Sequence, residues 1–525
     1  MKLPLTPGRI DLGLVLLFFG LKFWLNDQRI DWWYDGNYYA DIARNLARGD
    51  GFTSSISMFH SGLPSFPHPS PVYPLWPLLL GAVAMVVPME TAAVWLPSAL
   101  YLGTLVVAAR LGRRLLPEQP FAALPLDGGH LTLLVWALAN RFVEVTSKPY
   151  TEGLACFLLA LALLRIGSGP PTVRSGVEAG LWCAALLGTR GPFIVPVFAI
   201  LGVLWLAEGR FRRALAATAT LGLCTVLADQ FWFRSIPNAT VMTLLRFDHW
   251  VVTPGLSGVD LFVKPSSVLD TVRDRLQGVS AAYSPAGSFR IMKNFGFLAY
   301  LPFFLVVPAV AQEFWRQLRG NLLLQLAAAV GLAQLALLHL LHKQSFAEWN
   351  FPIRHALPVL WLYVALFPVV FGGRFLQTAV GPLVRALATA LLCGGLAFGV
   401  EWSMGRRNAM NYSPSSYKYR KAVSAWMLKQ MKEDPDLRIA NPTPQLYVRH
   451  ARGVGFIATH PFTTLDDLGV MVEKGGMDYL VMTSSAYRKA EYPYLKDEGA
   501  FARRFERVPD SPGGAIIFRP RTESP

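Results

Sequence analysis

The stretch DWWYDGNYYADIARNLARGDGF, residues 31–52, follows the first strongly apolar run of the chain. From Asp35 onward its apolar side chains recur at helical spacing, and the polar side chains gather on the opposite face. Gly49 and Gly51 close the pattern, as glycines commonly do after a helix. An amphipathic helix directly after a membrane-length apolar run predicts a helix that lies on the membrane surface.

The composition of the whole chain is typical of a protein that crosses the bilayer many times. Of its 525 residues, 53% are hydrophobic and only 16% are charged, whereas soluble domains carry about 25% charged residues. The net charge is +15, but the basic residues are dispersed and no nucleic-acid-binding module is visible. Such an excess normally collects in cytoplasmic loops. The four cysteines lie in apolar runs without CxxC spacing, which indicates neither a disulfide framework nor a zinc site.

Eleven spans are expected when the apolar runs are oriented by their flanking lysines and arginines. The orientation of the later spans depends on whether residues 72–88 cross the membrane. This stretch is apolar but short, and it has no basic residue at either end. If this stretch lies along the outer face, the basic loops from residue 110 onward fall inside, as the positive-inside rule requires. The spans are then expected at 10–25, 92–111, 130–146, 152–166, 176–189, 192–207, 213–233, 294–312, 321–341, 355–371 and 379–400.

Two parts follow from this arrangement. Residues 1–400 are expected to form a transmembrane domain whose outer side carries a first loop, 26–91, and a large loop, 234–293. Residues 401–525, here called the tail, alternate short strand-like runs with helical segments, which predicts a soluble α/β domain outside the membrane. The predicted fold class is a polytopic α-helical membrane protein with a C-terminal extracytoplasmic α/β domain.

The order of motifs along the chain resembles that of the GT-C glycosyltransferases, polytopic enzymes that include protein O-mannosyltransferases and lipid A aminoarabinose transferases. The first loop carries YDGNYYADIARNLARGDGF and then HPSPVYPLWPLLLGA, where the family has an acidic pair, a Tyr-Tyr helix, G-x-G-F and H-P-P-x-Y-P. SKPYTEGLACFLLALAL, GLWCAALLGTRGPFIVPV and FPIRHALPVLW are similar to three later motifs. Gly36 stands where the second acid of the pair is common, so one carboxylate is expected there instead of two.

The resemblance implies an inverting transfer of a sugar from a polyprenyl-phosphate donor to an acceptor hydroxyl at the outer face of the membrane. It places Asp35 as the base that takes the acceptor proton and Glu152 as a second catalytic carboxylate. Arginine suits the lipid phosphate because its fork can bind two oxygens. The substrate-binding residues that the resemblance implies are Tyr38, Tyr39, His68, Lys148, Arg190 and Arg354.

The expected partners are the polyprenyl-phosphate-sugar donor, membrane lipids, and an acceptor that is a lipid, a polysaccharide or a protein; no nucleic acid is expected. Asp35 and Glu152 could together hold a divalent cation, but no two histidines share a tight motif, so no metal ligand is assigned. The expected location is the cytoplasmic (inner) membrane of a bacterium, with the active site facing the periplasm. Nothing in the residues names the sugar or the acceptor.

Plainer interpretations stay open for each residue. Asp35 could be only a helix N-cap, Glu152 an acid favoured by a helix dipole, and the outer cations could reach toward lipid headgroups. For the whole chain, a transporter or flippase of a lipid-linked sugar is the competing function, although such proteins often show internal repeats and none is found here. A scaffold built around the tail is a third class. The enzyme hypothesis requires Asp35, Glu152 and Arg190 to lie around one outward cavity, and residues that point apart would count against it.

Overall fold

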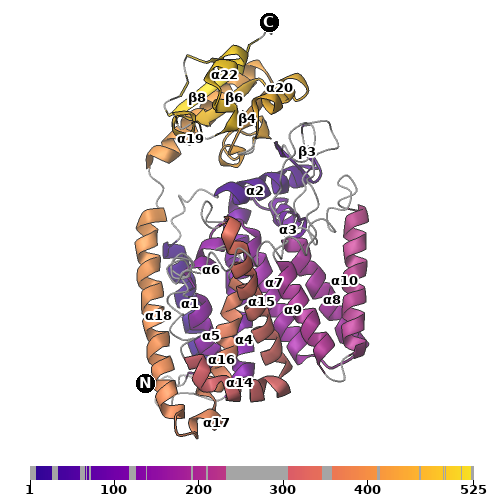
Figure 1. Ribbon diagram of the computed structural model, residues 1–525, viewed down its shortest axis with the longest axis vertical. Helices are drawn as coiled ribbons and strands as arrows, with labels where there is room; N and C mark the ends of the chain where they lie inside the picture. Colours follow the sequence, from indigo (N-terminus) through magenta and orange to yellow (C-terminus); the bar gives the residue numbers. More distant parts are fainter. Residues whose placement is uncertain are drawn as a thin grey trace.

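The structure, a computed structural model, is a bundle of helices with a small α/β unit at one end (Figure 1). It describes residues 7–25, 33–58, 66, 68–69, 73–117, 126–137, 139–190, 193–207, 211–231, 306–345, 357–410, 414–459, 463–488, 490, 492–509, 511–512 and 514–521.

The bundle consists of apolar helices at most of the places where spans were predicted. These helices are α1 (Pro7–Leu25), α4 (Met89–Leu115), α5 (Gly128–Ala137), α6 (Asn140–Val145), α7 (Thr151–Ser168), α8 (Val173–Thr189), α9 (Ile194–Leu206), α10 (Phe211–Phe231), α15 (Leu322–Ser345), α16 (Leu360–Phe371) and α18 (Gly381–Met410). Within the described residues, three segments are long and apolar enough to cross a bilayer: α4, α7 and the Phe211–Ala228 part of α10. Five more are apolar but shorter, so the number eleven stays a prediction.

The predicted span at 294–312 is described only in its last residues, 306–312, and stays a prediction. Its first part, 294–305, lies outside the described residues, and α14 (Val307–Gly320) is amphipathic. Glu313 and Arg316 form an ion pair on its polar face, and the Trp315 side chain is exposed. A helix of this kind is typical of a membrane surface. With the four-residue helix α17 (Gly373–Leu376), it lies at the end of the bundle away from the α/β unit (Figure 1).

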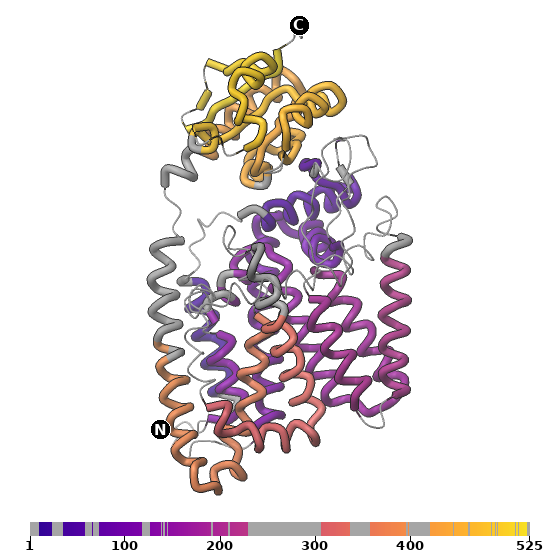
Figure 2. The backbone as a smooth tube through the Cα atoms, in the orientation of Figure 1, coloured from indigo at the N-terminus to yellow at the C-terminus, as the bar shows by residue number. Residues whose placement is uncertain are grey.

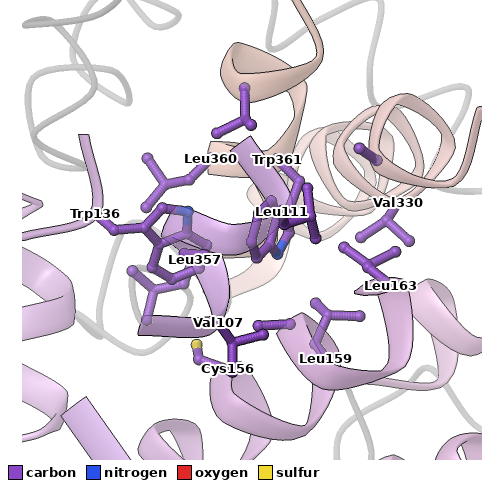
Figure 3. Close-up of a cluster of buried hydrophobic side chains, with 14 of the residues drawn as sticks. Val107, Leu111, Trp136, Cys156, Leu159, Leu163, Val330, Leu357, Leu360 and Trp361 are labelled. Atoms are coloured by element: carbon purple, nitrogen blue, oxygen red, sulfur yellow. The ribbon is translucent and has the colours of Figure 1, made fainter. Parts of the chain in front are cut away.

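The core of the bundle is a continuous cluster of buried side chains from α4, α5, α7, α15 and α16 (Figure 3). The Trp136 and Trp361 rings lie at its centre, with ring centroids 4.9 Å apart. Leu111, Leu159 and Val330 surround them. Such interlocking contacts fix the helices that carry the outer loops, because packing is the main force between helices in lipid.

Contacts between α1 and α4 establish which end of each helix is which. Near one end, the Lys22 ammonium donates to Ser98 Oγ at 2.7 Å. Near the other, Arg113 Nη2 lies 2.8 Å from Asp11 Oδ2. The two helices are therefore antiparallel, and the start of α1 lies at the Arg113 end of the bundle. The α/β unit lies at the opposite end, as the charge distribution predicted (Figure 1).

The tail supplies most of a six-stranded sheet with strand order β2-β5-β4-β6-β8-β7. β2, β5, β4 and β6 are parallel, whereas β8 is antiparallel to β6 and to β7. The tail strands are β4 (Arg438–Asn441), β5 (Gly455–Ala458), β6 (Tyr479–Thr483), β7 (Phe505–Arg507) and β8 (Ala515–Pro520). The helices around them are α19 (Pro414–Glu433), η6 (Pro444–Leu446), α20 (Leu465–Glu473), α21 (Ser484–Arg488), η7 (Pro493–Leu495) and α22 (Glu498–Arg504).

The predicted boundary between the two parts does not coincide with a structural one. Position 400 falls inside α18, and the edge strand β2 (Ile56–Met58) comes from the first outer loop. β2 pairs with β5 in parallel, with Ile56 opposite Phe456. The sheet is thus completed by a strand that lies far away from the others in the sequence. The same loop also forms a two-stranded pairing of β1 (Thr53–Ser54) with β3 (His68–Pro69).

The amphipathic helix predicted from the opening stretch is present as α2 (Trp33–Arg48). It packs against α3 (Leu75–Ala84), and both lie at the end of the bundle that faces the tail (Figures 1 and 2). α3 occupies the centre of the stretch expected to lie along the membrane face. Its ten residues are too few to cross a bilayer, which needs about 20.

Candidate functional site

Three side chains predicted separately from sequence meet at the tail-facing end of the bundle. Arg190 Nη1 lies 2.8 Å from Glu152 Oε1 and 3.7 Å from Asp35 Oδ2. One guanidinium nitrogen thus lies within ion-pair distance of both carboxylates. The three residues come from the first turns of α2 and α7 and from the residue after α8, and they do not point apart. That they surround one outward cavity stays a prediction.

Helix ends hold the three charges in place. Asp35 lies in the first turn of α2, and Glu152 is the second residue of α7. Both carboxylates therefore lie at the positive end of a helix dipole. Arg190 directly follows α8, where its backbone N–H donates to the Leu186 carbonyl at 3.3 Å and its cation lies at the negative end. Each charge has the sign that its helix end favours.

A fourth residue, Thr151, also contacts the guanidinium. Arg190 Nη1 donates to Thr151 Oγ1 at 3.1 Å, and that hydroxyl donates to Glu152 Oε2 at 3.2 Å. Sequence reasoning missed Thr151. The signal was its position directly before Glu152, at the start of the same helix.

The two carboxylates differ in their access to solvent. The Glu152 side chain is fully buried, whereas the Asp35 side chain is 30% exposed. Solvent therefore reaches the Asp35 carboxylate but not that of Glu152. This difference assigns different chemistry to two residues that the sequence placed in one class.

The turn before Glu152 is anchored by α3. The Trp76 indole N–H donates to the Pro149 carbonyl at 2.8 Å, and Trp76 is fully buried. Lys148 lies in the same turn, buried, with its ammonium 5.6 Å from the centre of the Tyr150 ring. Lys148 thus lies in the turn that leads into Glu152.

The structure places Tyr38 and Tyr39 in packing positions. Both are buried, Tyr38 in a hydrophobic cluster with residues of the tail and Tyr39 in the core of the bundle. Their role in substrate binding stays a prediction.

The remaining predicted residues are described only in part. His68 pairs in β3 with Ser54 of β1, so its backbone is placed close to the end of α2, while its side chain lies outside the described residues. Arg354 lies wholly outside the described residues. Neither assignment is tested by these contacts.

The arrangement of the carboxylates does not suit a divalent cation. Asp35 and Glu152 face the same guanidinium nitrogen, which fills the place where a shared metal would lie. Across the described part of the chain, no group of three His, Cys, Asp or Glu side chains could hold a metal ion. We therefore derive no step through a metal.

A shallow groove of about 490 Å³ lies elsewhere, between α17 and the first turns of α18. Arg385 and Thr389 line it together with apolar side chains. The groove lies at the end of the bundle away from the tail and contributes nothing to the three-charge site (Figure 1).

No protein-family model matches the chain, and no curated protein matches it by sequence. Solved structures do match. The archaeal oligosaccharyltransferase AglB from Archaeoglobus fulgidus, in complex with an inhibitory peptide and a dolichol-phosphate, aligns over 98% of this chain and 76% of its own, with 12% identity and a TM-score of 0.56. ArnT from Cupriavidus metallidurans bound to undecaprenyl phosphate aligns over 98% of both chains, with 14% identity and a TM-score of 0.50.

At such low identity these similarities concern the fold. They extend over nearly the whole chain, including both the bundle and the tail. The predicted resemblance is confirmed at this level: the chain has the fold of the GT-C glycosyltransferases.

Proposed function

We propose that this protein is a membrane glycosyltransferase that moves a sugar from a polyprenyl-phosphate donor to an acceptor hydroxyl, with inversion at the anomeric carbon. The observation that carries the proposal is the meeting of Asp35, Glu152 and Arg190 at one end of the bundle. A transfer of this kind needs a base for the acceptor and a cation for the leaving phosphate, and the site has both.

Asp35 is the base in this proposal. Its carboxylate accepts the proton of the acceptor hydroxyl while the hydroxyl oxygen forms a bond to the anomeric carbon of the sugar. The bond from that carbon to the phosphate oxygen breaks, and the polyprenyl phosphate leaves on the opposite face. Asp35 suits this role better than Glu152, because a partly exposed carboxylate can meet the acceptor and a fully buried one cannot.

Arg190 stabilises the charge of the leaving phosphate. A guanidinium binds phosphate oxygens through several N–H donors and stays charged in proteins. Glu152 and Thr151 orient it, since both contact Nη1. The catalytic role of Glu152 is therefore to position Arg190.

We propose a polyprenyl phosphate as the lipid carrier, on the basis of the similar solved structures and of the membrane setting. AglB was solved with a dolichol-phosphate and ArnT with undecaprenyl phosphate, both of them polyprenyl-type phosphates. The tail of such a donor stays in the bilayer, and the site lies at the end of the bundle, where a phosphate at the membrane surface can reach it. We propose that this end faces the periplasm of a bacterium, because the basic loops that connect the predicted spans lie at the other end.

The test can be run before the sugar is identified. In a strain that lacks the gene, mass spectrometry of lipids and glycans should detect a polyprenyl-phosphate sugar that accumulates and a glycan that is missing its sugar. Purified protein should release the polyprenyl phosphate from that lipid when membranes of the strain supply the acceptor. Transport of the intact lipid-linked sugar without release of the phosphate would contradict the proposal and indicate a flippase.

A further inference from the structure

The helix that carries Asp35 is buried on two sides, by the bundle and by the tail. Tyr39, Ala40 and Ala43 belong to the core cluster of the bundle. Tyr38 and Ile42, on another face of α2, belong to a cluster whose other members include Phe456 and Ile439 of the tail sheet. α2 therefore lies as a wedge between the two parts, as Figure 1 shows.

The chain after α2 ties this helix into the tail sheet. The Asp41 carboxylate accepts hydrogen bonds from Ser55 N–H at 2.7 Å and from Ser54 Oγ at 2.9 Å. The next residues form β2, and the Phe456 N–H of β5 donates to the Ser55 carbonyl at 2.8 Å. Asp41 thus links the middle of α2 to the strand that completes the sheet.

A chain of charges makes a third connection. Arg452 of the tail donates to Glu90 of α4 at 2.5 Å. Arg44 of α2 is buried between Glu90, 4.0 Å away, and Asp41, 3.8 Å away. The bundle, α2 and the tail therefore share one set of ion pairs.

The contact of Asp35 with Arg190 Nη1 is longer than that of Glu152 with the same atom. The Asp35 oxygen lies 3.7 Å from Arg190 Nη1, longer than a hydrogen bond, whereas Glu152 contacts the same atom at 2.8 Å. Because Asp35 lies in the first turn of α2, its position depends on how α2 is packed. Tyr38 follows Asp35 by three residues, which puts the two side chains about one turn apart on the same side of the helix.

We propose that the tail is a positioning element for the base: it holds α2, and through α2 it holds Asp35 near Arg190. The positioning residues are Tyr38 on α2 and Arg452 on the tail, one on each side of the contact between α2 and the tail. The inference rests on the proposed function of Asp35. It assigns to the tail a role in the chemical step, in place of a role in acceptor recognition alone, because a base displaced by 1 Å can lose about 10²-fold in rate.

The expected results separate positioning from substrate binding. In the full-length protein, Tyr38→Ala should lower kcat by about 10²-fold, with KM for donor and acceptor within about twofold of wild type. Tyr38→Phe keeps the packed ring and removes only the hydroxyl, so its kcat should lie well above that of Tyr38→Ala. A Tyr38→Phe enzyme with a strongly raised KM would instead make Tyr38 a substrate contact and contradict the proposal.

Arg452→Ala tests the tail side with little risk to folding, because Arg452 is about half exposed. We expect a kcat several-fold below wild type with unchanged KM. Arg519→Ala is the matched control, since Arg519 pairs with Glu506 within the tail sheet and not with α2 or α4. Equal losses in the two variants would show a general effect on the tail and overturn the specific role of Arg452.

Hydrogen exchange of the α2 amides gives a readout that does not depend on activity. Tyr38→Ala and Arg452→Ala should both speed exchange in residues 33–48 while β4, β5 and β6 keep wild-type rates. Unchanged exchange in α2, or faster exchange with unchanged kcat, would overturn the inference. If the wild-type protein transfers no sugar, the proposed function fails, but the exchange data still decide whether the tail holds α2.

Discussion

At the scale of single residues, the site joins charges that the sequence could identify but whose contacts it could not predict. Asp35, Glu152 and Arg190 could be predicted because each stands in a motif at an outer turn. That Arg190 lies between the two carboxylates could not be predicted, because side-chain distances depend on how α2, α7 and α8 pack. For the same reason, the sequence could not show that Glu152 is buried while Asp35 is partly exposed.

Removing Arg190 should affect folding as well as donor binding. Arg190→Gln leaves the Glu152 carboxylate buried without its cation, a change that typically costs about 3–5 kcal/mol. The double variant Arg190→Gln/Glu152→Gln removes both charges, so it should regain most of that stability. It should not regain affinity for a polyprenyl phosphate.

Thermal unfolding and lipid-phosphate binding of the purified variants check this expectation. Arg165→Ala is a suitable control, since Arg165 is an exposed arginine in the last turn of α7. Donor affinity that returns together with stability in the double variant would show that Arg190 has only a structural role.

At the scale of elements, α2 shows both the reach and the limit of sequence patterns. Its helical spacing predicted the helix from Asp35 to Arg48 correctly, and the structure begins it two residues earlier. The three-residue strand β2 escaped notice, because a strand so short has no pattern of its own and its partner β5 lies far along the chain. Long-range pairing of this kind is set by tertiary packing and leaves no local signal.

Asp41 should make the contact between α2 and the following loop sensitive to pH. Burial raises the pKa of this carboxyl, even though hydrogen bonds from Ser55 and Ser54 and the charge of Arg44 oppose the rise. Between its unfolded pKa, about 3.9, and its raised folded pKa, the folded protein binds more protons than the unfolded chain. The contribution of Asp41 to stability therefore falls as the pH rises through this window.

Asp41→Asn lacks this titration. The melting temperature of the wild type, measured relative to that of the variant, should therefore decrease from pH 4 toward neutral pH. Asn can still accept the bond from the Ser55 N–H, so the loop should stay in place. A difference that grows in favour of the wild type as the pH rises would mean that the folded pKa is lowered and would contradict the burial argument.

At the scale of the whole molecule, apolar runs located the helices but not their number. α5 and α6 divide one predicted span into two short helices, and α18 continues to Met410, beyond the predicted end at residue 400. Hydropathy measures composition, whereas helix breaks and extensions depend on local packing. Charge did predict the arrangement of the ends, because the start of α1 and the tail lie at opposite ends of the bundle (Figure 2).

We expect the N-terminus inside the cell and the tail outside. A reporter that is active only in the cytoplasm should work when fused after Arg114 and fail when fused at the C-terminus, and a periplasmic reporter should give the reverse. The physical reason is the gathering of arginines at the end of the bundle that holds Arg113. A cytoplasmic C-terminus would place the three-charge site on the wrong side for this proposal.

The central claim is that Asp35 is the base, and Asp35→Asn tests it most directly. Asp35 lies inside the first turn of α2 and is not its N-cap. Asn has nearly the same shape as Asp, but it cannot take a proton at neutral pH. Asp50→Asn is the control, since Asp50 is an exposed acid in the same loop. We predict that Asp35→Asn, with a wild-type melting curve, transfers sugar from a polyprenyl-phosphate donor about 10²–10⁴-fold more slowly than wild type, while Asp50→Asn stays active. An Asp35→Asn enzyme with nearly normal activity would contradict the account.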